Sequence, residues 1–474
     1  MNAIRRHTAT VAALLALALA PSAHAGGPSM LLGATEDAVR SQSPAVAQAQ
    51  MDLLAKAGFG AVRITQIWEP GDTKPSAADA AVLANVMTAA RKDGIEVLTT
   101  VMNYGSKTTP LTDADQADFA AFAAAVVRTA GVRHLIVGNE PNLNRYWLPQ
   151  FDDSGVDVAA AAYESLLAMT YDTVKAADPT AEVIGGALAP RGGDVGGGIR
   201  PTHSPTLFIE DLGAAYRASG RTAPIMDALT LHPYEEHSSI APADGVHPNS
   251  TTIELADYGK LVTLLGQAFD GTAQPGSMLP IYFDEFGVES QIPPAKRPLY
   301  TGTEVPVTQP VDEATQASYY AQAIQLAFCD PTVRGFFLFH AVDEKAMAGW
   351  QSGVYYPDDT PKASLAGVRY AIDRARRGVI AKCPGMALTP KATVVQQGQL
   401  VRLTCDLDCS LVVQLYGGGG HLLASKRWHG TGGRPTTLPI RVPQTKGTYR
   451  LRVSLVAPVN PGKPGLLRRV LAPA

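Results

Sequence analysis

Two patterns of apolar residues alternate along residues 29–378 of the chain. In the first, short runs are apolar or β-branched at nearly every position, which is typical of strands buried on both faces. In the second, Ala-rich segments carry apolar residues with helical spacing, and several end in Gly or Asp-Pro. The runs predict strands at 29–35, 61–68, 96–103, 134–140, 182–188, 227–234, 280–287 and 335–342. The Ala-rich segments predict helices at 45–58, 77–94, 116–131, 158–179, 206–220, 252–269, 314–328 and 362–378.

Eight strand–helix pairs over about 350 residues predict a (β/α)8 TIM barrel of the α/β class. The alternative is a doubly wound open sheet, which usually carries a Gly-rich phosphate-binding loop after its first strand. The sequence "LLGATEDAVR" at 31–40 has no such pattern. We therefore predict a barrel domain at 26–382.

Near Pro384 the helical spacing disappears. Apolar and polar residues alternate over 393–417, 436–443 and 447–457, and Gly-rich turns separate these stretches. This pattern predicts a small all-β, sandwich-like domain at 386–474. That domain holds twelve Lys or Arg and two Asp, hence a charge of +10, which leaves −13 for the rest of a chain of net charge −3. Two interpretations stay open: a module that binds an anionic cell-wall polymer, and a solvated spacer.

The N-terminus has the three parts of a secretory signal peptide. Arg5 and Arg6 give the positive region, "VAALLALALA" the apolar region, and "AHA" at 23–25 a small-residue cleavage site. The apolar run is too short to cross a hydrocarbon core of about 30 Å comfortably. We therefore predict a signal peptide at 1–25 and a secreted, extracellular mature protein, with a membrane anchor as the disfavoured alternative.

The four cysteines suit an exported protein, where an even number can pair. We expect disulfides between Cys329 and Cys383 and between Cys405 and Cys409. The first would tie a barrel helix to the segment that leaves the barrel. A zinc site is the alternative, but "CDLDC" has no His nearby at zinc spacing.

The composition argues against two classes of partner. A net charge of −3 over 474 residues gives no reason to expect a nucleic acid. No stretch after the signal peptide has the length and hydropathy of a membrane span, so we expect no membrane partner after cleavage.

Polar, aromatic and acidic residues gather at the ends of the predicted strands. In a barrel these ends converge on the one face where active sites of this architecture lie. The set comprises Arg63, Gln66, Trp68, Asn103, Tyr104, Asn139, Glu140, His232, Tyr234, Asp284, Glu285, His340, Asp343 and Glu344, with Trp147, Trp350 and Tyr355 in the loops that follow.

Two carboxylates in this set have positions that suggest chemistry. Glu140 ends the fourth predicted strand and Glu285 the seventh, so the two face each other across the mouth of an eight-stranded barrel. Paired carboxylates are the minimum equipment for cleaving a glycosidic bond, one as acid and one as nucleophile or base. Aromatic residues around them suit sugars, whose C–H faces stack on rings. A solvated loop carboxylate is the alternative for each glutamate taken alone.

These motifs resemble those of the clan A, or 4/7 superfamily, of retaining glycoside hydrolases, over roughly residues 29–380. "GNEP" at 138–141 and "FDEFG" at 283–287 match the strand-four acid/base motif and the strand-seven nucleophile motif of the clan in residue type, strand number and order. Arg63 on strand two and His232 and Tyr234 on strand six match further clan positions. Within the clan the chain looks most like families 5 and 39.

The resemblance implies a secreted glycosidase that hydrolyses O-glycosyl bonds of a poly- or oligosaccharide without metal or cofactor. Glu140 would be the acid/base and Glu285 the nucleophile. Asn139 would hydrogen-bond the sugar 2-hydroxyl, while Tyr234 and Arg63 would hold Glu285 ionised. The residues that we predict to contact substrate are Arg63, Trp68, Asn103, Asn139, Trp147, His232, Tyr234, His340 and Trp350.

One departure from the clan pattern concerns strand eight, where many members place a Trp. Here "FFLFHAVDE" offers Phe339 and His340, and Trp350 in the next loop is the substitute that we expect. Packing is an equally open interpretation for Trp68 and Trp147. The missing Trp also motivates a different function, that of a non-hydrolytic carbohydrate-binding barrel associated with the cell wall.

Overall fold

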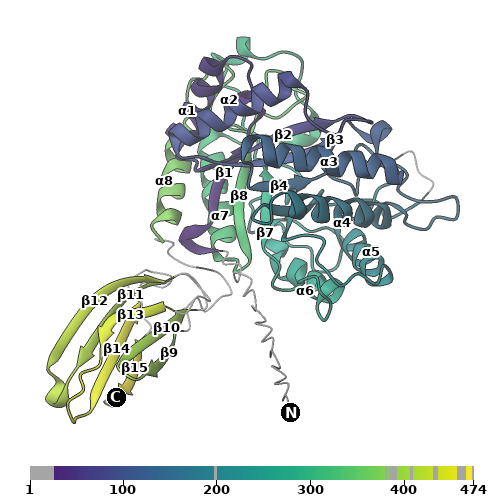
Figure 1. The fold of residues 1–474 in the computed structure, drawn as a ribbon. Coiled ribbons are helices and arrows are strands. Elements are labelled where there is room, and N and C mark those ends of the chain that lie inside the picture. The colour runs from purple at the N-terminus through teal and green to yellow at the C-terminus, as the bar shows by residue number, and fades with distance from the viewer. Residues whose placement is uncertain are drawn as a thin grey trace, which may run out of the picture.

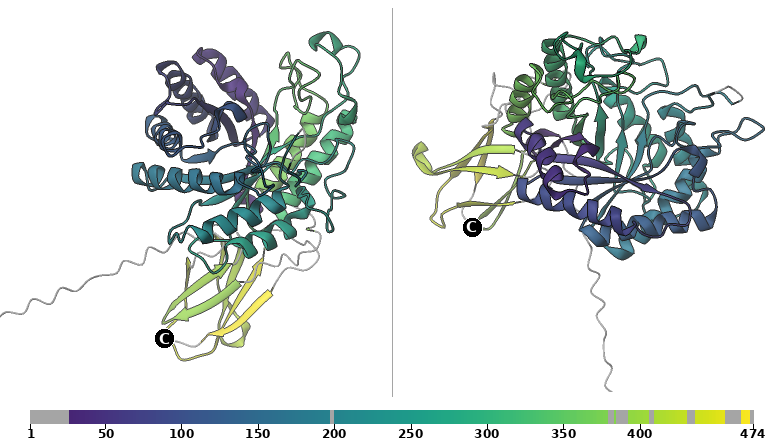
Figure 2. Two further views of the ribbon diagram at one scale, coloured as in Figure 1. Left: turned by 90° about the vertical axis from the view of Figure 1, so that its right-hand side faces the viewer. Right: turned by 90° about the horizontal axis from the view of Figure 1, so that it is seen from above.

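The computed structural model describes residues 26–196, 200–378, 383, 392–405, 409–430, 436–455 and 466–471. The predicted signal peptide at 1–25 lies outside this part of the chain and stays a prediction. Figures 1 and 2 show two bodies, a barrel ringed by helices and a β-sandwich beside it.

The barrel is a closed sheet of eight parallel strands in the order β1-β2-β3-β4-β5-β6-β7-β8. This confirms the predicted (β/α)8 barrel. The strands are β1 (Leu31–Thr35), β2 (Ala61–Trp68), β3 (Glu96–Asn103), β4 (His134–Val137), β5 (Glu182–Leu188), β6 (Ala228–Leu231), β7 (Ile281–Phe286) and β8 (Val333–Phe339). The helices are α1 (Pro44–Ala57), α2 (Ala77–Asp93), α3 (Asp113–Ala130), α4 (Ala159–Ala177), α5 (Pro205–Ala218), α6 (Tyr258–Phe269), α7 (Glu313–Cys329) and α8 (Ser364–Arg376).

Capping residues explain where several helices begin and end. The Ser43 hydroxyl accepts a hydrogen bond from the Val46 N–H at the start of α1, and Thr112 and Asp312 cap α3 and α7 in the same way. Gly58 ends α1 in the left-handed conformation at φ 91°, which a residue without Cβ adopts at little cost.

Burial on both faces explains the continuous apolar runs. Every residue of β5 and of β7 is buried. The outer faces pack on the helices, and the interior is filled by side chains that include Tyr282 and Phe337. Gly33 leaves space for the Phe337 ring, because a Cβ at residue 33 would lie only 2.5 Å from that ring. The core thus fixes how the strands meet at the site-bearing end.

Several predicted boundaries at the mouth of the barrel were wrong, because hydrogen bonding changes there; strand β8, for example, ends at Phe339 rather than at residue 342. Strand β4 ends at Val137 and β6 at Leu231, several residues before the predicted ends, because the polar residues after them leave the sheet. Helix α6 begins at Tyr258 rather than near residue 252, after a 3-10 turn (Leu255–Asp257).

The C-terminal domain consists of a three-stranded sheet in the order β13-β10-β9 and a four-stranded sheet in the order β12-β11-β14-β15. The strands are β9 (Ala392–Gln397), β10 (Leu400–Cys405), β11 (Cys409–Tyr416), β12 (Leu422–Gly430), β13 (Thr436–Arg441), β14 (Tyr449–Leu455) and β15 (Leu466–Leu471). Alternating residues such as Val401, Leu403, Leu411 and Val413 form a core of its own. The predicted all-β character is confirmed, although β12 and β15 were not predicted.

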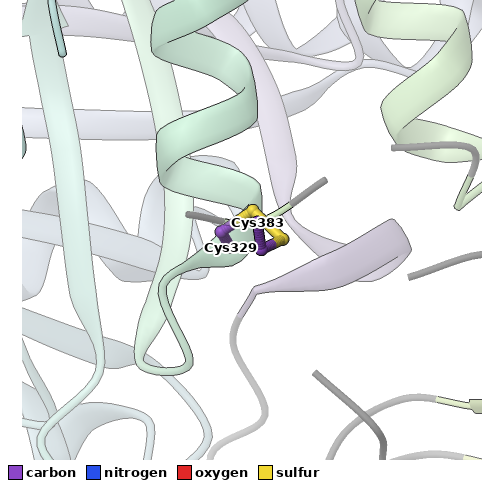
Figure 3. The surroundings of a disulfide bond; sticks show 2 residues. All are labelled: Cys329 and Cys383. Carbon is purple, nitrogen blue, oxygen red and sulfur yellow. A yellow bond between two sulfur atoms is a disulfide. The ribbon is translucent and has the colours of Figure 1, made fainter. Parts of the chain in front are cut away.

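A disulfide joins Cys329, the last residue of α7, to Cys383, with 5.4 Å between the Cα atoms (Figure 3). This confirms the first predicted pairing. Cys329 precedes β8, so the bond lies at the end of the barrel opposite to the carboxyl ends of the strands. The side chains of Cys405 and Cys409 lie outside the described part of the chain.

Within that part, no helix is both long and apolar enough for a membrane span.

We predict that Cys383→Ala lowers the free energy of unfolding by about 4 kcal/mol, because the bond closes a long loop in the unfolded chain. The sequence separation of 54 residues sets that size. Urea unfolding of the variant and the wild-type protein, followed by tryptophan fluorescence, measures the difference. Coincident unfolding curves would contradict the prediction.

Candidate active site

Glu140 lies just beyond β4, where the backbone turns sharply out of the sheet. Gly138 makes the turn at φ 79°, and its N–H donates to Val101 O at 2.8 Å. Glu140 itself has φ 42°, and its N–H donates to Ala187 O at 2.8 Å. A non-glycine residue in this region costs on the order of 1–3 kcal/mol, and such strain concentrates at functional sites. The turn aims the Glu140 carboxyl across the barrel mouth.

Glu285 is on β7 and is 8% exposed. Its partners come from β2, which does not pair with β7, and from the end of the adjacent β6. An Nη1 hydrogen of Arg63, on β2, is donated to Oε1 of Glu285, and the Tyr234 hydroxyl, just after β6, donates to Oε2 at 2.9 Å. Both oxygens of the carboxylate are therefore held in a fixed orientation.

His232 lies between the two glutamates. Its Nδ1 is 3.0 Å from Oε1 of Glu140 and 3.5 Å from Oε2 of Glu285. These two oxygens are therefore separated by no more than the sum of the two distances, about 6.5 Å. The other ring nitrogen, Nε2, is 3.4 Å from Oδ1 of Asp284.

The charges around His232 keep it protonated. Its burial alone would lower its pKa, but the charges of Glu285 and Asp284, together with the hydrogen bond to Glu140, raise the pKa of His232 to about 10. At neutral pH this residue is an imidazolium with an acidic partner on each side. It carries the positive charge that lets Glu140 and Glu285 lie so close together.

Arg63 is the second buried cation of the site, at 2% exposed. It donates from Nε to Thr100 Oγ1 at 2.7 Å and from Nη2 to Asn139 Oδ1 at 2.9 Å. Its Nε also lies 3.1 Å from Oδ2 of Asp284. Burial would lower the pKa of Arg63, but Asp284 and Glu285 raise it above its usual value.

Asp284 completes the network beneath the two glutamates. It is fully buried, and Thr230 donates a hydrogen bond to its carboxylate. Burial opposes its ionisation, yet the charges of His232 and Arg63 lower the pKa of Asp284. Asp284 thus serves as a fixed countercharge for the two cations rather than facing the cavity.

A cavity of about 310 Å³ opens above these residues. This volume is at the small end of the range of ligand pockets, about 300–1,000 Å³. Trp350 stacks on Tyr234 with 4.7 Å between ring centroids, and together they form an aromatic wall. The lining comprises Asn139, Glu140, Arg145, Tyr146, Tyr234, Glu285, Phe339, Glu344, Ala348, Gly349 and Trp350.

Six residues predicted to contact substrate do not line the cavity: Arg63 and His232 are buried beneath the two glutamates, and Trp68, Trp147, Asn103 and His340 lie elsewhere. Trp68 is fully buried against Phe119, and its Nε1 donates to Asp72 O at 2.8 Å. Trp147 is 1% exposed and packs on Tyr163. Neither indole is accessible to a sugar, so the packing interpretation holds for both.

The other two serve the surrounding loops. Asn103 is 3% exposed, and its amide donates to the carbonyls of Gly105 and Tyr146 at 2.7 and 2.9 Å. His340 lies outside the cavity lining, with Nδ1 2.7 Å from Thr35 O. The Asn103 amide and His340 Nδ1 are thus engaged by backbone carbonyls, which explains polar groups at strand ends without substrate contact.

Sequence reasoning did not single out Arg145 and Tyr146, which line the cavity. Both follow Glu140 on the same loop, and hydrogen bonds from Leu143 N–H to Glu140 O (2.9 Å) and from Tyr146 N–H to Leu143 O (3.1 Å) fold that loop back. Their closeness in sequence to Glu140 was the one available signal. Among the described residues, no group of three or more His, Cys, Asp or Glu is arranged to hold a metal ion.

Comparisons with protein-family models and with curated proteins find no match. Solved structures with a similar course of the chain include Bacteroides uniformis β-glucuronidase 2 (13% identity, TM-score 0.47), where the match covers 94% of this chain and 46% of that one. This chain thus spans about half the length of that protein. GH5_18 from Streptomyces cattleya in complex with GlcNAc has 16% identity and a TM-score of 0.49, with 74% and 81% of the two chains covered. A monomeric β-xylosidase from Caulobacter crescentus has 15% identity and a TM-score of 0.46, with 88% and 96% covered.

The raised pKa of His232 predicts how its contribution to stability depends on pH. A group whose pKa rises on folding, here from 6.5 to about 10, stabilises the fold fully below the lower value and loses this effect as pH rises through the higher one. We expect His232→Asn to destabilise the protein most near pH 6 and progressively less as pH approaches 10.

Urea unfolding of both proteins from pH 6 to 10 measures this difference. A variant at His134 is a suitable comparison for His232→Asn. The pKa of His134 is also raised, to about 9, but His134 lies at a site remote from the cavity. A destabilisation by His232→Asn that stayed constant over the whole range would show that His232 is not held as a cation.

Proposed function

We propose that this chain is a retaining glycoside hydrolase of the clan A type, acting on a poly- or oligosaccharide. The observation that carries the proposal is the placement of Glu140 and Glu285 on one cavity, with two of their oxygens no more than about 6.5 Å apart, the sum of the two distances to His232. The motif match in the sequence, in residue type, strand number and order, supports the same conclusion.

The separation of the carboxylates favours retention of configuration. Retaining enzymes place the two groups about 5–5.5 Å apart, whereas inverting enzymes leave room for a water at about 6.5–9.5 Å. The upper bound at His232 applies to one oxygen of each carboxyl group and includes the retaining range, and the motif match on strands four and seven favours the same class. A double displacement through Glu285 is therefore the mechanism that the geometry supports.

In the first step, Glu285 attacks the anomeric carbon as a carboxylate while Glu140 gives its proton to the glycosidic oxygen. The bond from the anomeric carbon to that oxygen breaks, and a glycosyl ester forms on Glu285. Water then attacks the ester from the side of Glu140, which takes the proton of the water. The carboxylate of Glu285 leaves, and the sugar keeps its original configuration.

His232 suits this two-step reaction, because the negative charge moves from Glu285 to Glu140 in the first step. Before the first step Glu285 is ionised and Glu140 is protonated; after it, Glu285 is an ester and Glu140 is ionised. The imidazolium lies within 3.0 Å of one carboxyl and 3.5 Å of the other, so it faces one negative charge at each stage. A fixed cation between the two groups lowers the cost of that transfer without moving.

The other contacts position the reacting groups. The Tyr234 hydroxyl and Arg63 hold both oxygens of Glu285, so that the nucleophile cannot rotate away. Arg63 also donates from Nη2 to Asn139 Oδ1 at 2.9 Å, and because this bond uses the oxygen, the amide hydrogens of Asn139 remain available for a sugar hydroxyl within the described structure. Trp350 and Tyr234 offer the aromatic face on which a sugar ring packs.

We infer further that the protein acts outside the cell. The signal-like residues 1–25 and the Cys329–Cys383 disulfide both suit an oxidising compartment. The +10 charge of residues 386–474 suits a role in holding the enzyme to an anionic wall polymer.

The nucleophile is tested by Glu285→Ala, assayed on a panel of 2,4-dinitrophenyl β-glycosides. We expect turnover to fall by about a thousandfold or more, because the covalent step is lost. Sodium azide should restore it by direct displacement and give a glycosyl azide of inverted configuration, as seen by NMR. Glu285→Gln, which leaves no room for azide, should not be rescued.

The acid/base is tested by Glu140→Ala on the same substrates, whose leaving group needs no proton. Here azide should attack the glycosyl ester and give a glycosyl azide of retained configuration. Glu236→Gln is the matched control, because Glu236 is an exposed carboxylate on the same face and outside the cavity lining. Full activity in both Ala variants would rule out the proposed function.

A further inference from the structure

Four charged side chains line the cavity: Glu140, Glu285, Glu344 and Arg145. The three carboxylates each have a basic neighbour. His232 serves Glu140 and Glu285, and the ring of His340 lies 3.7 Å from Oε1 of Glu344. His340 is itself protonated at neutral pH: burial would lower its pKa, but Glu344 and Glu36 help raise it to about 9.

Arg145 is the exception in this set. Arg145 is exposed, its guanidinium lies over the Tyr146 ring, 5.3 Å from the centroid, and within the described part of the chain it has no ion pair with a carboxylate. It contrasts with Arg63, which is buried and bonded to both Glu285 and Asn139. Among the described residues, Arg145 is thus the one charged group of the lining that no opposite charge contacts at ion-pair distance, although three carboxylates line the same cavity.

The place of Arg145 in the cavity fixes which part of a substrate it meets. A general acid faces the glycosidic oxygen, so the wall next to Glu140 is the wall that the leaving group contacts. Arg145 and Tyr146 follow Glu140 on the folded loop, and burial together with Glu140 raises the pKa of Tyr146 to about 12. Because both residues follow Glu140 on this loop and line the same cavity, we assign the leaving-group wall to them.

A second loop extends this wall. The amide of Asn103 donates to Tyr146 O at 2.9 Å, and the Ser106 N–H donates to Arg145 O at 3.0 Å. These bonds fasten the loop after β3 to the loop after β4. Tyr104, between the two anchoring residues, is 73% exposed and lies outside the set of residues that line the cavity, so its ring is free to meet a sugar that extends beyond the lining. Aromatic faces and a free guanidinium are the groups that bind a charged sugar.

We propose that Tyr104, Arg145 and Tyr146 form a leaving-group subsite that selects a sugar carrying a negative charge. This inference rests on the proposed glycosidase function and names its substrate class as an acidic glycan. The charged group of the leaving sugar pairs with the Arg145 guanidinium, and the two tyrosines hold its ring. The +10 charge of the C-terminal domain is a separate feature that fits an acidic polymer.

The test compares substrates that share one glycone, chosen as the sugar of the 2,4-dinitrophenyl β-glycoside that the enzyme cleaves fastest. In one substrate fluoride replaces the leaving sugar, so the subsite stays empty. In three others the glycone is β-linked to glucuronic acid, to glucose 6-sulfate or to glucose. The measured quantity is kcat/KM, which reports the step in which the leaving group departs.

We expect the wild-type enzyme to prefer the two charged disaccharides to the glucose one. Arg145→Gln should reduce kcat/KM on the preferred charged disaccharide about tenfold more than on the fluoride, as loss of a charged hydrogen bond predicts. Arg145→Lys should retain part of that preference. Whether the carboxylate or the sulfate substrate loses more identifies the acidic group.

Tyr104→Ala should reduce kcat/KM on all three disaccharides about threefold to tenfold more than on the fluoride, because ring stacking does not depend on charge. Lys107→Gln is the matched control. Lys107 is an exposed cation on the same loop and, like Tyr104, is not among the lining residues, but it has no ring to stack on a sugar, so its loss should leave the ratios unchanged.

Two results would overturn the subsite while leaving the glycosidase proposal intact. One is an equal loss on the fluoride and on the charged disaccharides in Arg145→Gln. The other is a wild-type preference for the glucose disaccharide. A folded wild-type protein that cleaves neither the fluoride nor any disaccharide, over the whole glycone panel, would instead overturn the proposed function and this inference with it.

Discussion

Two cations buried among three carboxylates determine the geometry of the candidate site. Arg63 and His232 are both almost fully buried, and between them they contact Glu140, Asp284 and Glu285. Removing either cation would leave buried acidic groups uncompensated, which costs several kcal/mol. Removing the acidic groups would likewise leave the two buried cations without a countercharge. The five side chains are stable only as a set, and the set brings Glu140 and Glu285 together.

The barrel makes this set possible because it brings together residues that are far apart in sequence. Arg63 comes from β2, Glu140 from the end of β4, His232 from the end of β6, and Asp284 and Glu285 from β7. Closure of the sheet places all of these carboxyl ends on one rim. The apolar core beneath fixes the strands, so the polar network does not have to hold them in place. The unusual φ of Glu140 is the local cost of aiming its side chain inward.

The sequence was sufficient for the barrel, the sandwich and the Cys329–Cys383 bond. Periodicity and burial on two faces are local signals, and eight repeats of them leave few alternatives. The residues at the strand ends were also predictable, because a strand that ends in a carboxylate has no packing reason to do so. Strand β12 was missed because it is an edge strand: its exposed Leu422 and Leu423 do not alternate with polar residues as core strands do.

Which strand-end residues face the cavity was not predictable, because it depends on the rotation of each side chain. Trp68 is the last residue of β2, yet its indole turns outward to pack on Phe119. Arg145 lies in a loop without periodicity, and only the hydrogen bonds of that loop bring it over the cavity. The order of residues along a strand end gives their location on the rim and not the direction in which they point.

The most direct test of this account is to trap the covalent intermediate on Glu285. Incubation with a panel of 2-deoxy-2-fluoro-β-glycosyl fluorides slows the release of the sugar, so that an ester accumulates and can be found by mass spectrometry of the digested protein. The geometry predicts one added fluorosugar per chain, on the peptide that contains Glu285, and none in Glu285→Gln. An adduct on a different residue, or steady hydrolysis that releases sugar of inverted configuration, would contradict it.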